Sequence, residues 1–159
     1  MKNEQAPEHI LHQLADEFLP DCIDYWREFN RYRFNLKQLL PLLPANGSLL
    51  DLGAGNGVMS LALQVAGAQV TVADNWRPYS RENTDQEKPS MHHMGDHDQL
   101  LDRYRRHNIR TIETDLHEGS LPIEDETFDR GIIMALYKHF PGYPRERLED
   151  TKRGCKRVA

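Results

Sequence analysis

Three alternate glycines, Gly53, Gly55 and Gly57, form the pattern with the clearest chemical meaning in this chain. They follow the apolar run 48–52, and a helix-like pattern begins at Val58. Glycine has no side chain and readily takes a positive φ, so the backbone can bend sharply and a ligand can approach the main chain. The following helix would direct unpaired N–H groups and a partial positive charge toward that ligand. The pattern predicts a strand, a turn and a helix that bind a small adenosine-like cofactor.

The spacing of the glycines separates the classes of cofactor. In the dinucleotide fingerprint G-x-G-x-x-G, the third glycine falls where this chain has Val58, and here it comes one residue earlier, at Gly57. No Gly-Lys-Ser/Thr follows, which excludes a P-loop. Residues 51–57, Asp-Leu-Gly-Ala-Gly-Asn-Gly, instead resemble the first motif of the class I S-adenosylmethionine-dependent methyltransferases. The resemblance implies S-adenosyl-L-methionine as cofactor, with its methionyl tail along the glycine turn and its ribose at the end of the next strand.

Candidate contacts to this cofactor lie at the ends of the expected strands. Asp74 follows about 20 residues after the first glycine, where an acid can accept hydrogen bonds from both ribose hydroxyls; a helix cap or a loop acid is the alternative. The resemblance places Asn75 beside the adenine, Asp115 at its amino group and the Leu116 N–H at a ring nitrogen, although Asp115 could simply cap a turn. The predicted cofactor-binding residues are Asp51, Gly53, Ala54, Gly55, Asn56, Gly57, Asp74, Asn75, Asp115, Leu116 and Met134.

Two later segments extend the resemblance. Residues 121–129 are similar to the family's "LPfedesFD" run into the fourth strand, and 136–141 lie where the family commonly has "LhHlp". Lys138 departs from that second pattern, whereas His139 keeps it. His139 is therefore the predicted general base for methyl transfer, and a structural histidine bonded to a neighbouring loop is the alternative.

The acceptor and the activity remain less defined than the cofactor. No Asn/Asp-Pro-Pro-Tyr/Phe follows the fourth strand, and this is the motif that grips exocyclic amines in nucleic-acid methyltransferases. A small-molecule acceptor is favoured. Two rival functions stay open: a non-catalytic S-adenosylmethionine-binding or regulatory module, and a nicotinamide-dependent oxidoreductase.

The elements that must position these residues alternate between strand and helix. Strands are expected at 48–52, 69–73, 109–114 and 132–135, with helices at 58–65, 99–107 and 144–158. This alternation predicts an α/β fold with a parallel sheet. Together with the family resemblance and right-handed crossovers, it implies a Rossmann-like three-layer sandwich with the strand order 3-2-1-4. The carboxyl ends of all four strands then meet at one cleft.

The segment 1–47 is expected to be helical and the segment 48–159 to form the cofactor-binding domain. Residues 8–43 carry a helical apolar pattern broken at Pro20. The apolar stripe of its second half contains Ile23, Trp26, Phe29, Phe34, Leu36, Leu39 and Leu40. These helices serve either as core packing or as a lid over the cofactor cleft, which would place Arg31 and Arg33 near the acceptor or the cofactor carboxylate.

Residues 76–97 show no periodicity and are expected to form a long loop. Its histidines and aspartates match no metal-ligand spacing, so no metal is predicted, and acceptor binding, gating or disorder are the readings left open. The next segment, 99–107, should be a helix whose basic face (Arg103, Arg105 and Arg106) is solvated.

Composition limits the other classes. The 159 residues carry a formal net charge of −5, which favours neither nucleic acid nor anionic lipid as a partner. The absence of an apolar signal core or a membrane-length apolar run, together with two distant cysteines, predicts a cytoplasmic protein with reduced thiols. The resembled family continues into further C-terminal strands. Either the sequence is truncated, which we favour, or a second copy in a homodimer covers the open edge of the fourth strand.

Overall fold

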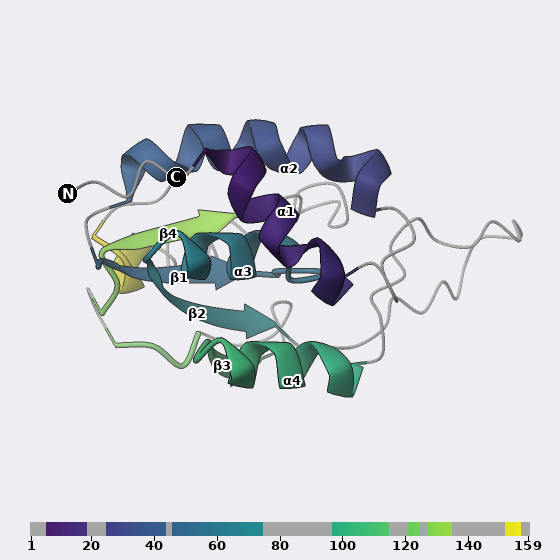
Figure 1. Cartoon of the computed structure of the whole chain (residues 1–159). Coiled ribbons are helices and arrows are strands. Elements are labelled where there is room, and N and C mark those ends of the chain that lie inside the picture. Colours follow the sequence, from purple (N-terminus) through teal and green to yellow (C-terminus); the bar gives the residue numbers. More distant parts are fainter. Residues whose placement is uncertain are drawn as a thin grey trace, which may run out of the picture.

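The computed structural model describes residues 6–18, 25–43, 46–74, 97–114, 121–124, 127–134 and 152–156 (Figure 1). Two helices come first, followed by a short 3-10 turn and then by alternating strands and helices. In chain order the elements are α1 (Pro7–Phe18), α2 (Tyr25–Leu39), η1 (Leu40–Leu42), β1 (Ser48–Leu52), α3 (Val58–Val65), β2 (Gln69–Asp74), α4 (His97–Arg106), β3 (Arg110–Glu113) and β4 (Arg130–Ile133).

The four strands form a parallel sheet in the order β3-β2-β1-β4. This confirms the predicted α/β, Rossmann-like fold and its strand order. The central strand β1 pairs with β2 through Leu52 and Ala73 and with β4 through Leu52 and Ile133. Parallel strands need a covered face on each side, and β1 is accordingly buried from Leu49 to Leu52.

Side chains of β1 alternate between two apolar clusters, as the pleat of a strand requires. Leu49 belongs to the larger cluster, which includes residues of α1, α2, α3 and α4. Leu50 and Leu52 belong to the smaller cluster, with Ala73 and with Phe128 from the segment before β4. Asp51 therefore faces the same side as Leu49, where its carboxyl meets Ser60 of α3.

The first two helices pack against each other and against α3 (Figure 1). The Tyr25 hydroxyl donates to the Leu11 carbonyl, and the rings of Phe18 and Tyr25 stack with centroids 5.9 Å apart. The predicted apolar stripe is partly wrong, because Trp26 and Phe34 are 48% and 63% exposed. The buried face of α2 is formed by Leu36, which the stripe included, and by Tyr25 and Tyr32, which it did not. Because tyrosine carries a polar hydroxyl, Tyr25 and Tyr32 were not counted in the apolar stripe.

The ends of the elements differ from the predictions by a few residues. The predicted strand 132–135 is observed as β4 at Arg130–Ile133, so Met134 lies one residue beyond it. Arg130 can begin this buried strand because its Nε donates to the Leu42 carbonyl at 3.0 Å. Helix α3 ends at Val65, as predicted. Gly67, with φ of 101°, follows the C-cap, and its N–H donates to the Gln64 carbonyl at 3.0 Å.

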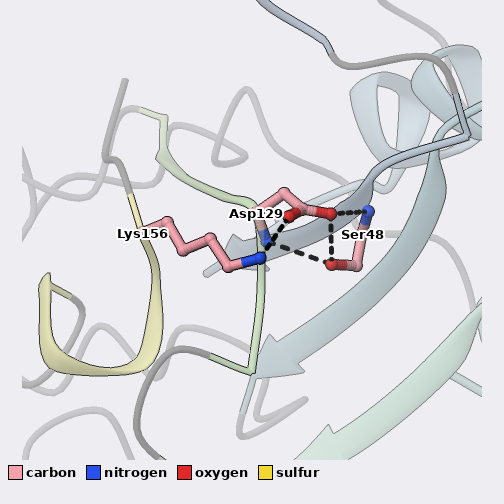
Figure 2. Close-up of polar contacts among 3 residues, drawn as sticks. All are labelled: Ser48, Asp129 and Lys156. Atoms are coloured by element: carbon pink, nitrogen blue, oxygen red, sulfur yellow. Dashed lines mark hydrogen bonds and ion pairs between the residues drawn. The ribbon is translucent and has the colours of Figure 1, made fainter.

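A polar clasp made of Ser48, Asp129 and Lys156 joins three segments at the amino end of the sheet (Figure 2). Asp129 Oδ2 accepts hydrogen bonds from the backbone N–H and the hydroxyl of Ser48, both at 3.0 Å. Lys156 Nζ lies 2.9 Å from Asp129 Oδ1. These hydrogen bonds lower the pKa of Asp129 to about 2, with the Lys156 bond as the largest cause.

The described C-terminal residues correct one expectation. The predicted helix 144–158 is helical at 152–154, but Cys155 forms a parallel bridge with Phe128. Phe128 donates to the Gly154 carbonyl and accepts from the Lys156 N–H, so the chain just before β4 has a backbone partner on its outer side. Cys155 is a buried free thiol whose pKa burial raises to about 11.

Candidate active site

Three of the predicted site positions form a row at the carboxyl edge of the sheet. Leu52 pairs with Ala73 on one side and Ile133 on the other, so the next residues, Gly53, Asp74 and Met134, follow in one row. The Gly53 N–H donates to the Ala73 carbonyl at 2.9 Å, which fixes where the glycine turn leaves β1. Asp74 is half-buried, ends β2 and lies opposite Glu113 of β3. Glu113 is a second acid at this edge that the sequence analysis did not single out.

The glycine turn, residues 53–57, has the backbone that its composition predicts. Gly53, Gly55 and Gly57 have φ of 67°, 60° and 78°, values that residues with a Cβ rarely adopt. A Cβ added at Gly55 would meet no atom within 4 Å among the described residues. The turn closes through the Gly57 N–H, which donates to the Ala54 carbonyl at 3.1 Å. The main chain at Gly55 is therefore open to close approach by a ligand.

Gly57 serves a different purpose from Gly55. A Cβ at Gly57 would lie 2.6 Å from Tyr104 Oη and 2.7 Å from Leu100 Cδ1, both on α4. The missing side chain therefore lets α4 pack directly against the turn. The sequence analysis did not identify this role, although Leu100 and Tyr104 are spaced four residues apart, as on one helix face.

Asp51 lies beneath the turn and is only 2% exposed. The Ser60 hydroxyl donates to Asp51 Oδ2 at 2.6 Å, while Oδ1 is buried without a hydrogen-bond partner among the described residues. Burial raises the pKa of this carboxyl to about 7, the Ser60 bond opposes that shift, and Asp74 adds to it. Leaving a buried polar atom unsatisfied costs on the order of 1–3 kcal/mol, so the vacant acceptor points to a ligand or a water as its partner.

Tyr104 completes a buried polar cluster with Asp51 and Ser60. Its side chain is fully buried, and burial together with the neighbouring Asp51 carboxyl raises the pKa of its hydroxyl. The cluster thus joins β1, α3 and α4 directly below the glycine turn. Neither Ser60 nor Tyr104 was predicted as a site residue, because they come close to Asp51 only when the helices pack on the sheet.

The side-chain amide of Asn56, at the tip of the turn, makes two hydrogen bonds. Its Oδ1 accepts from the Val58 N–H at 3.2 Å, which gives the N-terminus of α3 a side-chain acceptor. Its Nδ2 donates to the Tyr32 hydroxyl of α2 at 2.7 Å. The first helices therefore reach the glycine turn, as well as contributing to the core.

The expected solvated basic face of α4 is wrong for one arginine. Arg103 is 6% exposed, and its guanidinium carbon lies 4.9 Å from the centroid of the Phe18 ring. A desolvated cation over an aromatic face is favourable by roughly 2 kcal/mol. Nearby, His107 and Arg106 lie 2.7 Å and 3.7 Å from the carboxylate of Glu17. These contacts hold α4 against α1.

Four predicted site residues, Asn75, Asp115, Leu116 and the proposed base His139, lie outside the described residues, as does most of the expected loop 76–97. Their roles stay predictions. Within the described ranges no group of three or more His, Cys, Asp or Glu side chains is placed to hold a metal ion. None of the helices in the described part of the chain combines the length and the apolar character needed to span a membrane.

Comparison with known proteins identifies the family. A family model described as the methyltransferase domain matches residues 50–159, and the chain belongs to this family. This confirms the family that the glycine motif resembles. No curated protein matches the chain at a significant level.

Solved structures share the fold at low sequence identity. Coclaurine N-methyltransferase bound to N-methylheliamine and SAH has a TM-score of 0.54 and 16% identity, over 80% of this chain and 33% of that one. A TehB-like SAM-dependent methyltransferase from Corynebacterium glutamicum has a TM-score of 0.53 and 16% identity, over 84% and 66% of the two chains. A protein from Pyrococcus horikoshii OT3 has a TM-score of 0.53 and 26% identity, over 78% and 53%. This chain therefore spans less than two thirds of the length of each of them.

Proposed function

We propose that this chain binds S-adenosyl-L-methionine at the carboxyl edge of its sheet and transfers the methyl group to a small-molecule acceptor. The observation that carries the proposal is the combination of an open glycine turn with a buried acid beneath it. No atom of the described residues lies within 4 Å of a Cβ placed at Gly55, and Asp51 Oδ1 is a buried acceptor without a partner among those residues. Membership of the methyltransferase-domain family supports the same reading.

The residues present fit this cofactor better than a dinucleotide. The methionyl tail carries an ammonium, and a buried carboxyl with a vacant oxygen suits such a donor. The ribose needs an acceptor for its hydroxyls, and Asp74 ends β2 beside the glycine turn. The turn has Val58 where a dinucleotide fingerprint has its third glycine, and Val58 is fully buried. Each of these features agrees with a cofactor that lacks a pyrophosphate.

The bound cofactor would supply a methyl group activated by its sulfonium. The work of the protein is to hold that group and to align an acceptor behind it. The glycine turn would hold the methionyl portion, Asp74 the ribose, and Asn75, Asp115 and Leu116 the adenine. Met134, one residue beyond β4, would border the reacting end, and His139 is the proposed base. We also propose that the acceptor is a small molecule and that the protein is cytoplasmic.

The experiment that tests this function is a titration calorimetry series with S-adenosylhomocysteine and with NAD. We expect S-adenosylhomocysteine to bind and NAD not to bind. Asp74→Ala should weaken binding by about 1.5–3 kcal/mol, the scale of a hydrogen bond to a charged group, or roughly 10- to 150-fold in Kd. Asp102→Ala is the matched control, because it removes an exposed acid of α4 that pairs with Arg105. Unchanged affinity in Asp74→Ala would show that the ribose lies elsewhere.

A turnover assay then separates catalysis from binding alone. Methyl release from S-adenosylmethionine with small acceptors supports the enzyme. Tight binding with no methyl release on a broad acceptor panel would instead support the non-catalytic module. Binding of NAD without S-adenosylhomocysteine would overturn the proposal in favour of the oxidoreductase.

A further inference from the structure

A hydrogen bond joins the N-terminal helices to the tip of the glycine turn. The Tyr32 hydroxyl, on the buried face of α2, accepts from Asn56 Nδ2 at 2.7 Å. Asn56 lies between Gly55, which is open to a ligand, and Gly57, which packs against α4. The bond therefore acts on the part of the turn where the main chain is exposed to the cofactor.

The other end of the Asn56 amide is already occupied. Asn56 Oδ1 accepts from the Val58 N–H at 3.2 Å. The N-cap residue itself, Gly57, has no side chain that could cap the helix. An amide held at both ends has little freedom to rotate, and its backbone is fixed with it. Loss of the Tyr32 contact would release one end and leave the cap bond in place.

Tyr32 is itself held firmly by its surroundings. It is 4% exposed, its ring centroid lies 6.1 Å from that of Tyr25, and the Arg31 guanidinium carbon lies 5.4 Å from its ring centroid. Tyr25 in turn donates to the Leu11 carbonyl of α1. The position of α2 is thus transmitted to the turn through a rigid ring.

We propose that Tyr32 is a positioning residue for the cofactor, acting through Asn56 to hold the glycine turn in its binding conformation. The inference rests on the proposed function, since it assigns to the N-terminal helices a part in cofactor affinity. The role assigned to Tyr32 is positioning, because its hydroxyl acts on the turn through Asn56.

Two tyrosine-to-phenylalanine variants of the same helix give a matched test. Tyr32→Phe removes the hydroxyl that reaches Asn56, and Tyr25→Phe removes the hydroxyl that reaches Leu11, each with its ring kept. We expect Tyr32→Phe to weaken S-adenosylhomocysteine binding about 3- to 10-fold, the effect of one hydrogen bond. Tyr25→Phe should lower thermal stability at least as much and leave the affinity within about twofold. Equal loss of affinity in both variants would overturn the proposal, as would no loss in Tyr32→Phe.

A double-mutant cycle with Asn56→Ser isolates the contact. Serine can still cap α3 but is too short to reach Tyr32. In the Asn56→Ser background, Tyr32→Phe should cause no further loss of affinity; an additive loss would overturn the proposal. If Tyr32→Phe does not fold, amide hydrogen exchange of unliganded Asn56→Ser decides: faster exchange at residues 54–58 while α3 stays capped supports the proposal, and unchanged exchange would overturn it.

Amide hydrogen exchange without any ligand separates this inference from the proposed function. Exchange at residues 54–58 should be faster in Tyr32→Phe than in Tyr25→Phe. This comparison decides whether Tyr32 holds the turn even if the wild-type chain fails to bind S-adenosylhomocysteine, a result that would refute the proposed function. Equal exchange in the two variants would refute the positioning role.

Discussion

Two aspartates near opposite ends of β1 illustrate opposite uses of the same side chain. Asp51, near the carboxyl end, is buried with one oxygen bonded to Ser60 and the other without a hydrogen-bond partner among the described residues. Asp129, at the amino end, receives two hydrogen bonds from Ser48 and one from Lys156 (Figure 2). Burial raises the pKa of the first to about 7, and hydrogen bonds lower the pKa of the second to about 2.

The contrast teaches how to tell a structural acid from one kept for a ligand. A carboxylate whose oxygens accept hydrogen bonds from other residues of the chain stabilises the fold and has little acceptor capacity left for a ligand. A buried carboxyl with a vacant oxygen weakens the fold, and such groups gather at functional sites. By this criterion Asp51 supports the proposed cofactor site at the carboxyl edge, whereas Asp129 at the amino edge has a structural role.

The largest expected effect comes from removing the charge of Asp51. Its folded pKa of about 7 lies above the ordinary 3.8, so between these values the folded state keeps a proton that the unfolded chain has lost. The free energy of unfolding should therefore fall as pH rises from about 4 through about 7. Asp51→Asn should lack this fall and be more stable at pH 8 by on the order of 2–4 kcal/mol. The free energy of unfolding in urea should be measured against pH for the wild-type chain and for Asp51→Asn. The same pH dependence in both would show that Asp51 does not have a raised pKa.

An effect of similar size tests the packing of α4 on the turn. Gly57→Ala forces a Cβ against Tyr104 and Leu100 at a positive φ, and should lower the free energy of unfolding by about 2–4 kcal/mol. Gly67→Ala is the matched control, since its φ is also positive but no atom of the described residues lies within 4 Å of the new Cβ. It should cost only the backbone strain, about 1–2 kcal/mol, as measured by denaturant unfolding. An equal cost at both positions would show that α4 does not need the missing side chain.

The smallest effect is expected at the clasp. Since the folded pKa of Asp129 is lowered to about 2, its stabilising effect is present above the ordinary value of 3.8 and is lost as pH falls toward 2. Asp129→Asn should flatten the acid limb of the stability profile between about pH 4 and pH 2 and leave S-adenosylhomocysteine affinity unchanged. Weakened binding in this variant would mean that the two edges are not separate in function.

The features that the sequence predicts best are the ones encoded in short segments. The bend at Gly53, Gly55 and Gly57 depends on local backbone preferences, and the position of Asp74 follows from the length of one strand-helix-strand unit. The strand order followed from chirality rules together with the family resemblance. These are short-range or rule-governed properties, and the fold and the row of strand ends came from them.

The features that the sequence did not predict depend on contacts between distant segments. Tyr32 reaches Asn56 and Tyr104 reaches Gly57 only after α2 and α4 dock on the core. Residues 121–129 were identified through resemblance, but the bonding of Asp129 to Ser48 and Lys156 was not. Arg103 was expected in solvent because charged side chains are usually exposed. Its guanidinium instead packs over the Phe18 ring, a contact that the sequence of α4 alone does not reveal.

The central claim is that the cofactor binds at the carboxyl edge, over the glycine turn, and not at the amino edge. The most direct measurement is amide hydrogen exchange with and without S-adenosylhomocysteine. Slower exchange at residues 53–58 and at the end of β2, with no change at residues 128–130 and 154–156, is the predicted result. Protection confined to the amino edge, or unchanged exchange across the glycine turn at saturating ligand, would contradict it.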